Sequence, residues 1–194
     1  MPPQYFDLSD DVYLTGRWEL GKLTDPEGGK EVWPWLFKKG EPVLFPKSPV
    51  GPVRSPGRPL DFSHAAFGIP VVHARVASIF TEMAPADVQL VPVDIEGQSD
   101  PYFILNVIRV VKCIDDQASA EVRYWTEEDG LPEKVGRYSS VSGMRIDPTK
   151  PCDAKVFRTW GWQVALIVSE DIKVALERAG ATGLKFKEVT GPRL

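Results

Sequence analysis

The chain has 194 residues, a formal net charge of −4 and a hydrophobic content of 43%. This length allows one large domain or two small ones with a sizeable core. The acidic balance argues against a protein that grips nucleic-acid phosphates and weakly against one that binds anionic membranes. No apolar run approaches the roughly 18 residues of a membrane-spanning helix, and the first residues lack the pattern of a signal peptide. We therefore expect a cytoplasmic protein.

The N-terminal part predicts short strands followed by a long loop. Residues 4–37 contain apolar residues broken by glycines, which is typical of two or three short strands with tight turns. In this region, the aromatic segment 33–37 holds a proline that disfavours a central strand. Residues 40–60 contain six prolines, which lack the N–H that a strand donates, so we expect an extended, largely irregular loop. Two interpretations of this loop stay open: the P-x-x-P spacings at 46–59 are a ligand for aromatic grooves, or the loop covers the surface, which we favour.

One pattern occurs twice, 96 residues apart. An apolar strand, about three helical turns, a helix breaker and an alternating strand fill residues 71–93 and again residues 167–189. His73 in the first copy takes the place of Ser169, a capping residue, in the second. The repeat predicts an α+β fold with two short helices and a mixed or mostly antiparallel sheet. We expect one domain over residues 1–194.

Two related lobes follow from the repeat, an N-terminal lobe of about residues 1–97 and a C-terminal lobe of about 98–194. In the C-terminal half, residues 102–114 are apolar on both alternating faces and predict a central strand covered on both sides. Residues 121–126 predict another strand, and residues 130–155 are rich in glycine, proline and serine and predict mostly loop. Strands are also expected over 156–160.

No pattern of catalytic or metal-binding residues is present. His64 and His73 are far from any zinc-type spacing of histidines and cysteines, and Cys113 and Cys152 are expected to be free thiols. No nucleophile elbow or phosphate-binding glycine loop occurs. We predict no catalytic residue, no cofactor and no metal, and therefore no enzyme.

Asn106 and Arg109 interrupt the apolar run of residues 102–114. Buried polar side chains need partners, so these two either form internal ties or line a polar site. We favour internal ties. The alternative function is an enzyme of unrecognised, hydrolase-like type, with a polar pocket near these two residues.

Six tryptophans are spread along the chain, and we expect at least four of them in the core. Trp33, Trp35 and Trp125 are the best candidates for exposure, because charged or turn residues flank each of them. Tryptophan is also strongly enriched among the residues that dominate binding energy at protein interfaces.

Several stretches carry a resemblance to a known family: Tyr102–Asp115, Ile146–Pro148, Val156–Arg158, Trp162 and Val164–Lys173. The order and composition of these segments resemble a bacterial immunity-protein family, the eleventh catalogued among polymorphic toxin systems and formerly a domain of unknown function. The resemblance spans about residues 60–190. It implies a cytoplasmic protein that binds and neutralises a cognate toxin from sibling cells, without catalysis.

The resemblance supplies no fixed toxin-binding motif, so the contact residues are a hypothesis from residue type and expected exposure. An acidic inhibitor suits a basic toxin, such as one that attacks nucleic acid. The predicted toxin contacts are Trp33, Trp35, Trp125, Glu127, Glu128 and Asp129.

Overall fold

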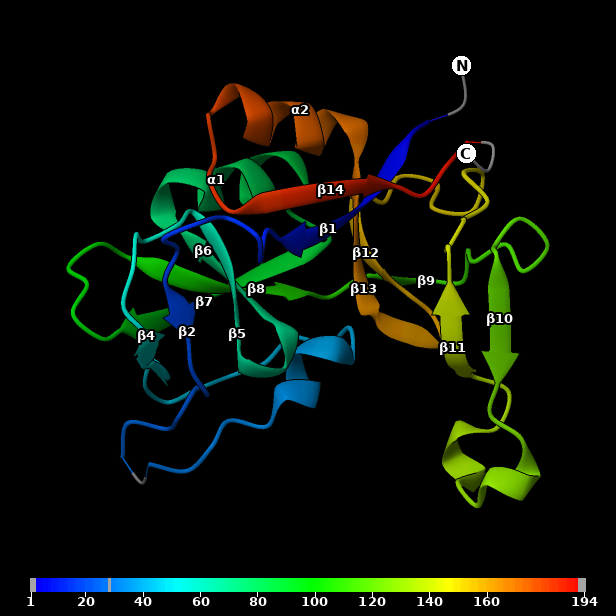
Figure 1. The fold of residues 1–194 in the computed structure, drawn as a ribbon, viewed down its shortest axis with the longest axis horizontal. Coiled ribbons are helices and arrows are strands. Elements are labelled where there is room, and N and C mark those ends of the chain that lie inside the picture. Colours follow the sequence, from blue (N-terminus) through cyan, green and yellow to red (C-terminus); the bar gives the residue numbers. More distant parts are fainter. Residues whose placement is uncertain (1–2, 28, 192–194) are drawn as a thin grey trace.

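The computed structural model describes residues 3–27 and 29–191, in which two five-stranded sheets and two α-helices form the scaffold (Figure 1). The first sheet has the spatial order β3 (Val50–Gly51), β7 (Val88–Ile95), β8 (Tyr102–Val107), β6 (Ile69–His73) and β5 (Phe62–Ala65). The second sheet has the order β14 (Leu184–Glu188), β1 (Tyr5–Asp10), β13 (Trp162–Ser169), β12 (Val156–Thr159) and β9 (Val110–Val111). The helices are α1 (Ala74–Met83) and α2 (Glu170–Arg178).

The predicted α+β class and the predicted pseudo-repeat are confirmed. In the first sheet, β6 and β7 are joined by α1 and lie on either side of β8, which is antiparallel to both. In the second sheet, β13 and β14 are joined by α2 and lie on either side of β1 in the same way. Each copy is thus a split β-α-β unit with a third strand inserted. Both sheets are mostly antiparallel, and β3 and β9 add parallel pairs at their edges.

The two inserted strands are exchanged between the halves of the sequence. β1 precedes the first copy in the chain but fills the gap in the second sheet, whereas β8 follows the first copy and fills the gap in the first sheet. Their ends are held alike: Asp11 N donates to Gly183 O and Ile108 N donates to Asp87 O, both over 2.9 Å. Each half of the chain, taken on either side of its midpoint, therefore supplies the central strand of the sheet that holds the other half's copy.

One apolar core lies between the two sheets and the two helices. Along each strand, alternate side chains enter this shared core while their neighbours point to the opposite face of the sheet. Val72 and Leu166, for example, lie in the shared core, whereas Val71 and Ile167 lie on the outer faces. The helices contribute apolar stripes to the shared core: Val76, Ala77 and Phe80 from α1, and Ile172 and Leu176 from α2.

Long insertions cover the outer faces of the two sheets. The first insertion, residues 11–61, packs Trp18, Leu23 and Phe37 against the first sheet. It contains a two-stranded sheet of β2 (Glu19–Leu20) and β4 (Val53–Ser55) and the 3₁₀ helix η1 (Pro34–Lys38). The second insertion, residues 108–155, packs Cys113, Met144, Ile146 and Ala154 against the second sheet. It contains the two-stranded sheet of β10 (Glu121–Tyr124) and β11 (Tyr138–Ser142).

The proline-rich stretch inside the first insertion is fixed to the body. Thr24 and Val50 exchange two backbone hydrogen bonds of 2.9 Å, and Asp94 N donates to Pro49 O over 2.9 Å. Pro49 is buried, so the P-x-x-P spacings that contain it are not displayed as a free polyproline ligand. This part of the stretch therefore covers the surface, as we favoured, whereas Pro56 and Pro59 of the third spacing are exposed and the polyproline interpretation stays open there.

The long apolar run of residues 102–114 is divided between the two sheets. Its first part, β8, is the central strand of the first sheet, as predicted. Its continuation, β9, is instead a half-buried edge strand of the second sheet, parallel to β12. β11 was predicted as loop, because its Tyr-Ser-Ser-Val-Ser sequence has no strong apolar alternation. Pairing with β10 makes it a strand.

The helix starts follow the prediction, with one difference. His73 caps α1, since its Nδ1 accepts a hydrogen bond from Arg75 N over 3.0 Å. Ser169 stands at the equivalent position before α2, but its hydroxyl donates to the carboxylate of Asp171 instead of capping the helix. Gly180 follows α2 with a φ of +61°, as expected for the residue that ends a helix.

The prediction that most tryptophans lie in the core is wrong. Trp18 is buried at 1% exposure, whereas Trp160 is 37% exposed and Trp125 and Trp162 are half-buried. Trp33 and Trp35 are exposed, as expected. All six lie in the insertions or at a strand end, and only Trp18 among them is fully covered by the rest of the chain. In four of them, Trp33, Trp35, Trp125 and Trp160, a neighbouring ammonium group covers part of the ring instead.

We predict that Gly183 is far less replaceable than Gly180. Both have a positive φ, of +87° and +61°, so alanine at either costs about 1–2 kcal/mol of backbone strain. A Cβ on Gly183 would also lie 2.2 Å from Phe62 O, whereas a Cβ on Gly180 meets nothing within 4 Å. Gly183→Ala should therefore lower the free energy of unfolding by about 1–3 kcal/mol more than Gly180→Ala in urea titrations. Equal losses would contradict the close approach of the two strands.

Candidate functional site

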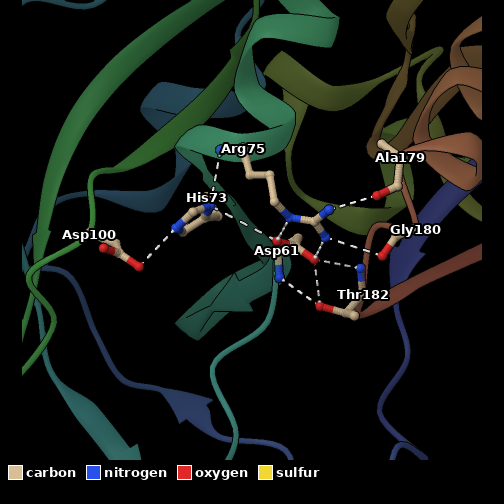
Figure 2. A network of polar contacts seen from close by, with 7 residues as sticks. All are labelled: Asp61, His73, Arg75, Asp100, Ala179, Gly180 and Thr182. Carbon is tan, nitrogen blue, oxygen red and sulfur yellow. Dashed lines mark hydrogen bonds and ion pairs between the residues drawn. The ribbon is translucent and has the colours of Figure 1, made fainter.

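A polar network joins the start of α1 to the end of α2 (Figure 2). Arg75 Nε donates to Asp61 Oδ1 over 3.0 Å, and Arg75 Nη2 donates to the other carboxylate oxygen. The same guanidinium donates to Ala179 O over 2.6 Å and to Gly180 O over 3.2 Å. These carbonyls lie at the C-terminal end of α2, where the last carbonyl groups have no N–H partner inside the helix and the helix dipole is negative. Arg75 thus closes the C-terminal end of α2 from the other half of the chain.

Both carboxylate oxygens of Asp61 accept hydrogen bonds within this network. Its Oδ2 accepts hydrogen bonds from Thr182 N over 2.8 Å and from Thr182 Oγ1 over 2.7 Å, in addition to that from Arg75. Burial raises the pKa of Asp61, but the hydrogen bonds from Arg75 and Thr182 outweigh it and hold the pKa below its usual value. The carboxylate is therefore ionised and internally paired, which suits a structural tie better than proton transfer.

Both histidines also pair with carboxylates. His73 Nε2 lies 3.3 Å from Asp100 Oδ2, and because its Nδ1 accepts from Arg75 N, the proton of neutral His73 is on Nε2. His64 Nδ1 lies 2.9 Å from Asp10 Oδ1, and Asp10 also accepts from Arg17. Across the described ranges 3–27 and 29–191, no three of His, Cys, Asp and Glu gather as a metal-binding group.

Asn106 and Arg109 contact different partners. Asn106 is fully buried, and its Nδ2 donates to Glu41 O and to Gln89 Oε1, each over 2.9 Å. Arg109 is partly exposed and pairs with Asp153 over 2.7 Å. The two side chains have no common partner among these contacts, and Asn106 holds the first insertion against β8. These contacts are the internal ties that we favoured.

Trp33 and Trp35 lie at η1, on the outer face of the first insertion. Trp33 is 54% exposed with Lys39 Nζ 5.2 Å from its ring centre, and Trp35 is 52% exposed with Lys38 Nζ at 4.8 Å. Arg158, which is 1% exposed on β12, donates from Nε to Phe37 O over 3.1 Å and so anchors η1 to the second sheet. The exposed rings are thus carried on a fixed segment.

A cavity of about 250 Å³ opens beside Trp33. Its buried and half-buried lining residues, Val32, Leu36 and Phe45, are apolar, and its exposed charged residues surround them. The cavity could therefore bind one amphipathic side chain. The residues that line it are Asp25, Pro26, Glu27, Lys30, Glu31, Val32, Trp33, Leu36, Phe45, Pro46 and Lys47.

The other predicted contacts lie on an arm that projects from the body (Figure 1). The arm is formed by β10, β11 and the tip between them, which contains the 3₁₀ helices η3 (Glu127–Asp129) and η4 (Pro132–Lys134). Where β10 and β11 meet the tip, the rings of Tyr124 and Tyr138 stack 4.7 Å apart, and both hydroxyls donate to Asp116. Burial, then these contacts, raise the pKa of Tyr138, so its hydroxyl stays a donor.

The acidic tip of the arm is ordered by its own hydrogen bonds. Asp129 Oδ2 accepts from Thr126 N over 2.8 Å and from Thr126 Oγ1 over 3.0 Å, which forms a capping box around η3. Glu127 and Glu128 are exposed on the same turn. Trp125 is half-buried, and Lys134 Nζ lies 4.9 Å from its ring centre. Within the predicted acidic set, Asp129 therefore shapes the tip, while Glu127 and Glu128 face outward.

Comparison with known proteins identifies the family of this chain. The model of an immunity protein family, Imm11, matches residues 24–191. The chain belongs to the Imm11 family. Among curated proteins, none matches this Imm11 protein. The described residues of the chain contain no helix that is both long enough and apolar enough to cross a membrane.

The structure exposes further aromatic residues of this Imm11 protein that the sequence analysis missed. Phe67 is 57% exposed and Tyr13 is 80% exposed. Phe67 lies in a short Ala-Phe-Gly turn between two apolar strands, so its sequence context resembles that of a core residue. The glycine after it was the available signal of a turn that points the ring outward.

We predict that Asp61→Asn lowers the free energy of unfolding by about 1–3 kcal/mol at pH 7, because it removes the charge from a buried carboxylate that accepts hydrogen bonds from Arg75 and Thr182. The pKa of Asp61 is depressed, so its contribution is present above the unfolded pKa of about 4 and is lost as the pH falls through the folded pKa. The difference between wild type and variant in urea titrations should therefore shrink from pH 6 towards about pH 2.

The matched control for this measurement is Asp153→Asn, which breaks the exposed pair with Arg109. Such a pair contributes at most about 1 kcal/mol. A loss at Asp61 as small as the loss at Asp153, or a difference that does not change with pH, would contradict the assigned role.

Proposed function

We propose that the chain binds one cognate toxin and neutralises it by occupying the surface that the toxin needs, without catalysis. Membership of the Imm11 family supports an immunity function. The observation that carries the mode of action is the projecting arm, whose exposed Glu127 and Glu128 are held on a turn fixed by the Thr126–Asp129 capping box. The toxin acts inside cells in this proposal, so the chain works in the cytoplasm.

Neutralisation by binding needs a rigid surface with a few dominant anchors. Interfaces of this kind depend on aromatic anchors, while complementary charge speeds association and selects the partner. The exposed Trp33 and Trp35 and the acidic tip with Trp125 have this chemistry. By contrast, Asp61 and Arg75 are already paired within the protein, which supports a structural role for them.

The charge of the tip indicates the kind of toxin. A pair of exposed carboxylates on a projecting turn complements a basic surface. Proteins that cut or modify nucleic acid carry such a surface, because they bind the phosphate backbone. We therefore propose a basic toxin, with Trp125, Glu127, Glu128 and Asp129 on one side of the interface and Trp33 and Trp35 as anchors elsewhere.

We predict that the double variant Glu127→Lys, Glu128→Lys fails to protect cells. The candidate toxin is the C-terminal domain of a secreted protein encoded by the neighbouring reading frame. The first test co-expresses this domain with wild type or variant and scores survival, and the second measures the dissociation constant of the purified pair. Replacing two attractive charges by two repulsive ones should weaken binding by about 100-fold or more. Asp129 is left intact so that the capping box keeps the tip folded.

The control is Asp94→Lys, Glu96→Lys, which makes the same charge change at exposed residues near the end of β7. This control should protect cells like the wild type. Full protection by the arm variant would remove the acidic tip from the interface, and failure of the wild type to protect would refute the proposed function itself.

A further inference from the structure

Phe67 combines high exposure with a backbone conformation that is unfavourable for its residue type. It lies in the 3₁₀ turn η2 (Ala66–Gly68) between β5 and β6, with φ +64° and ψ +23°. A bulky side chain in this left-handed region is a genuine outlier, whereas glycine adopts it without strain. The fold thus gives up stability to keep phenylalanine at this position.

The strain does not bring the ring into the core. Phe67 is 57% exposed and belongs to none of the three core clusters. Its ring lies under Lys22 Nζ, 5.3 Å from the ring centre, and its carbonyl accepts a hydrogen bond from Lys38 Nζ over 3.0 Å. Strained residues with this exposure cluster at binding sites, where the surrounding structure holds them in place.

Lys38 connects Phe67 to η1, which lies beside η2 on the side of the molecule away from the helices (Figure 1). The same ammonium group lies over the ring of Trp35, and Lys39 lies over the ring of Trp33. Three exposed rings are therefore each covered by one ammonium group. We call this set the aromatic–lysine surface: Trp33, Trp35, Phe67, Lys22, Lys38 and Lys39.

The charge of this surface is opposite to that of the whole chain. Lys22 pairs with Glu31 over 2.9 Å, and in the cavity beside Trp33 Lys47 pairs with Glu27 over 2.7 Å, which leaves Lys38 and Lys39 as further positive charges at the rings. The chain as a whole has a net charge of −4. A partner that docks here meets apolar ring surface and positive charge together.

We propose that the aromatic–lysine surface is a second contact with the toxin, and that it receives a part of the toxin that bears carboxylates beside apolar side chains. The proposal rests on the proposed function. Aromatic rings held by a rigid backbone are typical anchors of binding energy, and the ammonium groups select an acidic complement. The acidic arm and this surface then hold two oppositely charged regions of one toxin.

The experiment compares Phe67→Gly with Phe67→Ala, using the purified toxin domain encoded next to this gene. Both variants lack the ring, so both should bind the toxin about tenfold or more weakly than the wild type. Only glycine relieves the strain, so Phe67→Gly should raise the melting temperature by about 2–4 °C, whereas Phe67→Ala should not. A gain in stability with a loss of binding is the expected signature.

Tyr13→Ala is the control, because Tyr13 is exposed under Lys185 but lies outside the surface. It should leave binding unchanged. Lys39→Glu should weaken binding, and added salt should weaken binding of the wild type. Tighter binding by Lys39→Glu would overturn the acidic character of the partner region.

Two other results would overturn the proposal. If Phe67→Gly binds like the wild type, the ring is not a contact. If Phe67→Gly melts below the wild type, the ring stabilises the fold and the strain argument fails. Absence of binding by the wild type would instead refute the proposed function, so the two failures are distinct.

Discussion

The structure depends on one constraint: neither half of the chain can complete its own set of sheet hydrogen bonds. Each split β-α-β unit leaves a gap between two parallel strands, and an antiparallel strand fills it in both sheets. β1 fills one gap and β8 the other, across the boundary between the halves. Leu8 and Leu105 on these strands are both buried in the core that the halves share. Separation of the halves would expose that core and unpaired backbone together, so we expect them to unfold as one unit.

The polar ties at the junction follow from this arrangement and repeat with it. Before β5, the backbone N–H groups of Asp61 and Phe62 donate to the hydroxyl and the carbonyl of Thr182. Before β12, the equivalent N–H groups of Lys155 and Val156 donate to the carboxylate of Asp87, over 2.8 and 3.1 Å. Each strand that enters the core is thus fastened to the loop after the other half's helix, and its buried donors are satisfied.

The sequence allowed prediction of the local pattern but not of the exchange. Both helices and the strands after them were predicted from helix periodicity, from His73 and Ser169 before each helix and from the helix breakers. These signals act over a few residues. β1 could not be placed, since its partners lie more than 150 residues away and its own pattern is ordinary. For the candidate site, flanking charges correctly predicted the exposure of Trp33 and Trp35. The exposure of Phe67 was not predicted, because the residue stands between two apolar strands and only the glycine after it signals a turn.

The two insertions occupy equivalent places in the duplicated scaffold, each between an exchanged strand and the hairpin that follows it. Each folds a small two-stranded sheet and covers the outer face of one sheet, yet their exposed chemistry differs. Several polar side chains of the scaffold, such as Asp61, Arg75 and Asp87, form ties between the halves, whereas the insertions carry Trp33, Trp35 and the acidic tip. A rigid duplicated core therefore leaves the insertions free to differ. Their opposite charges suit a partner that must be held at two distinct regions rather than at one.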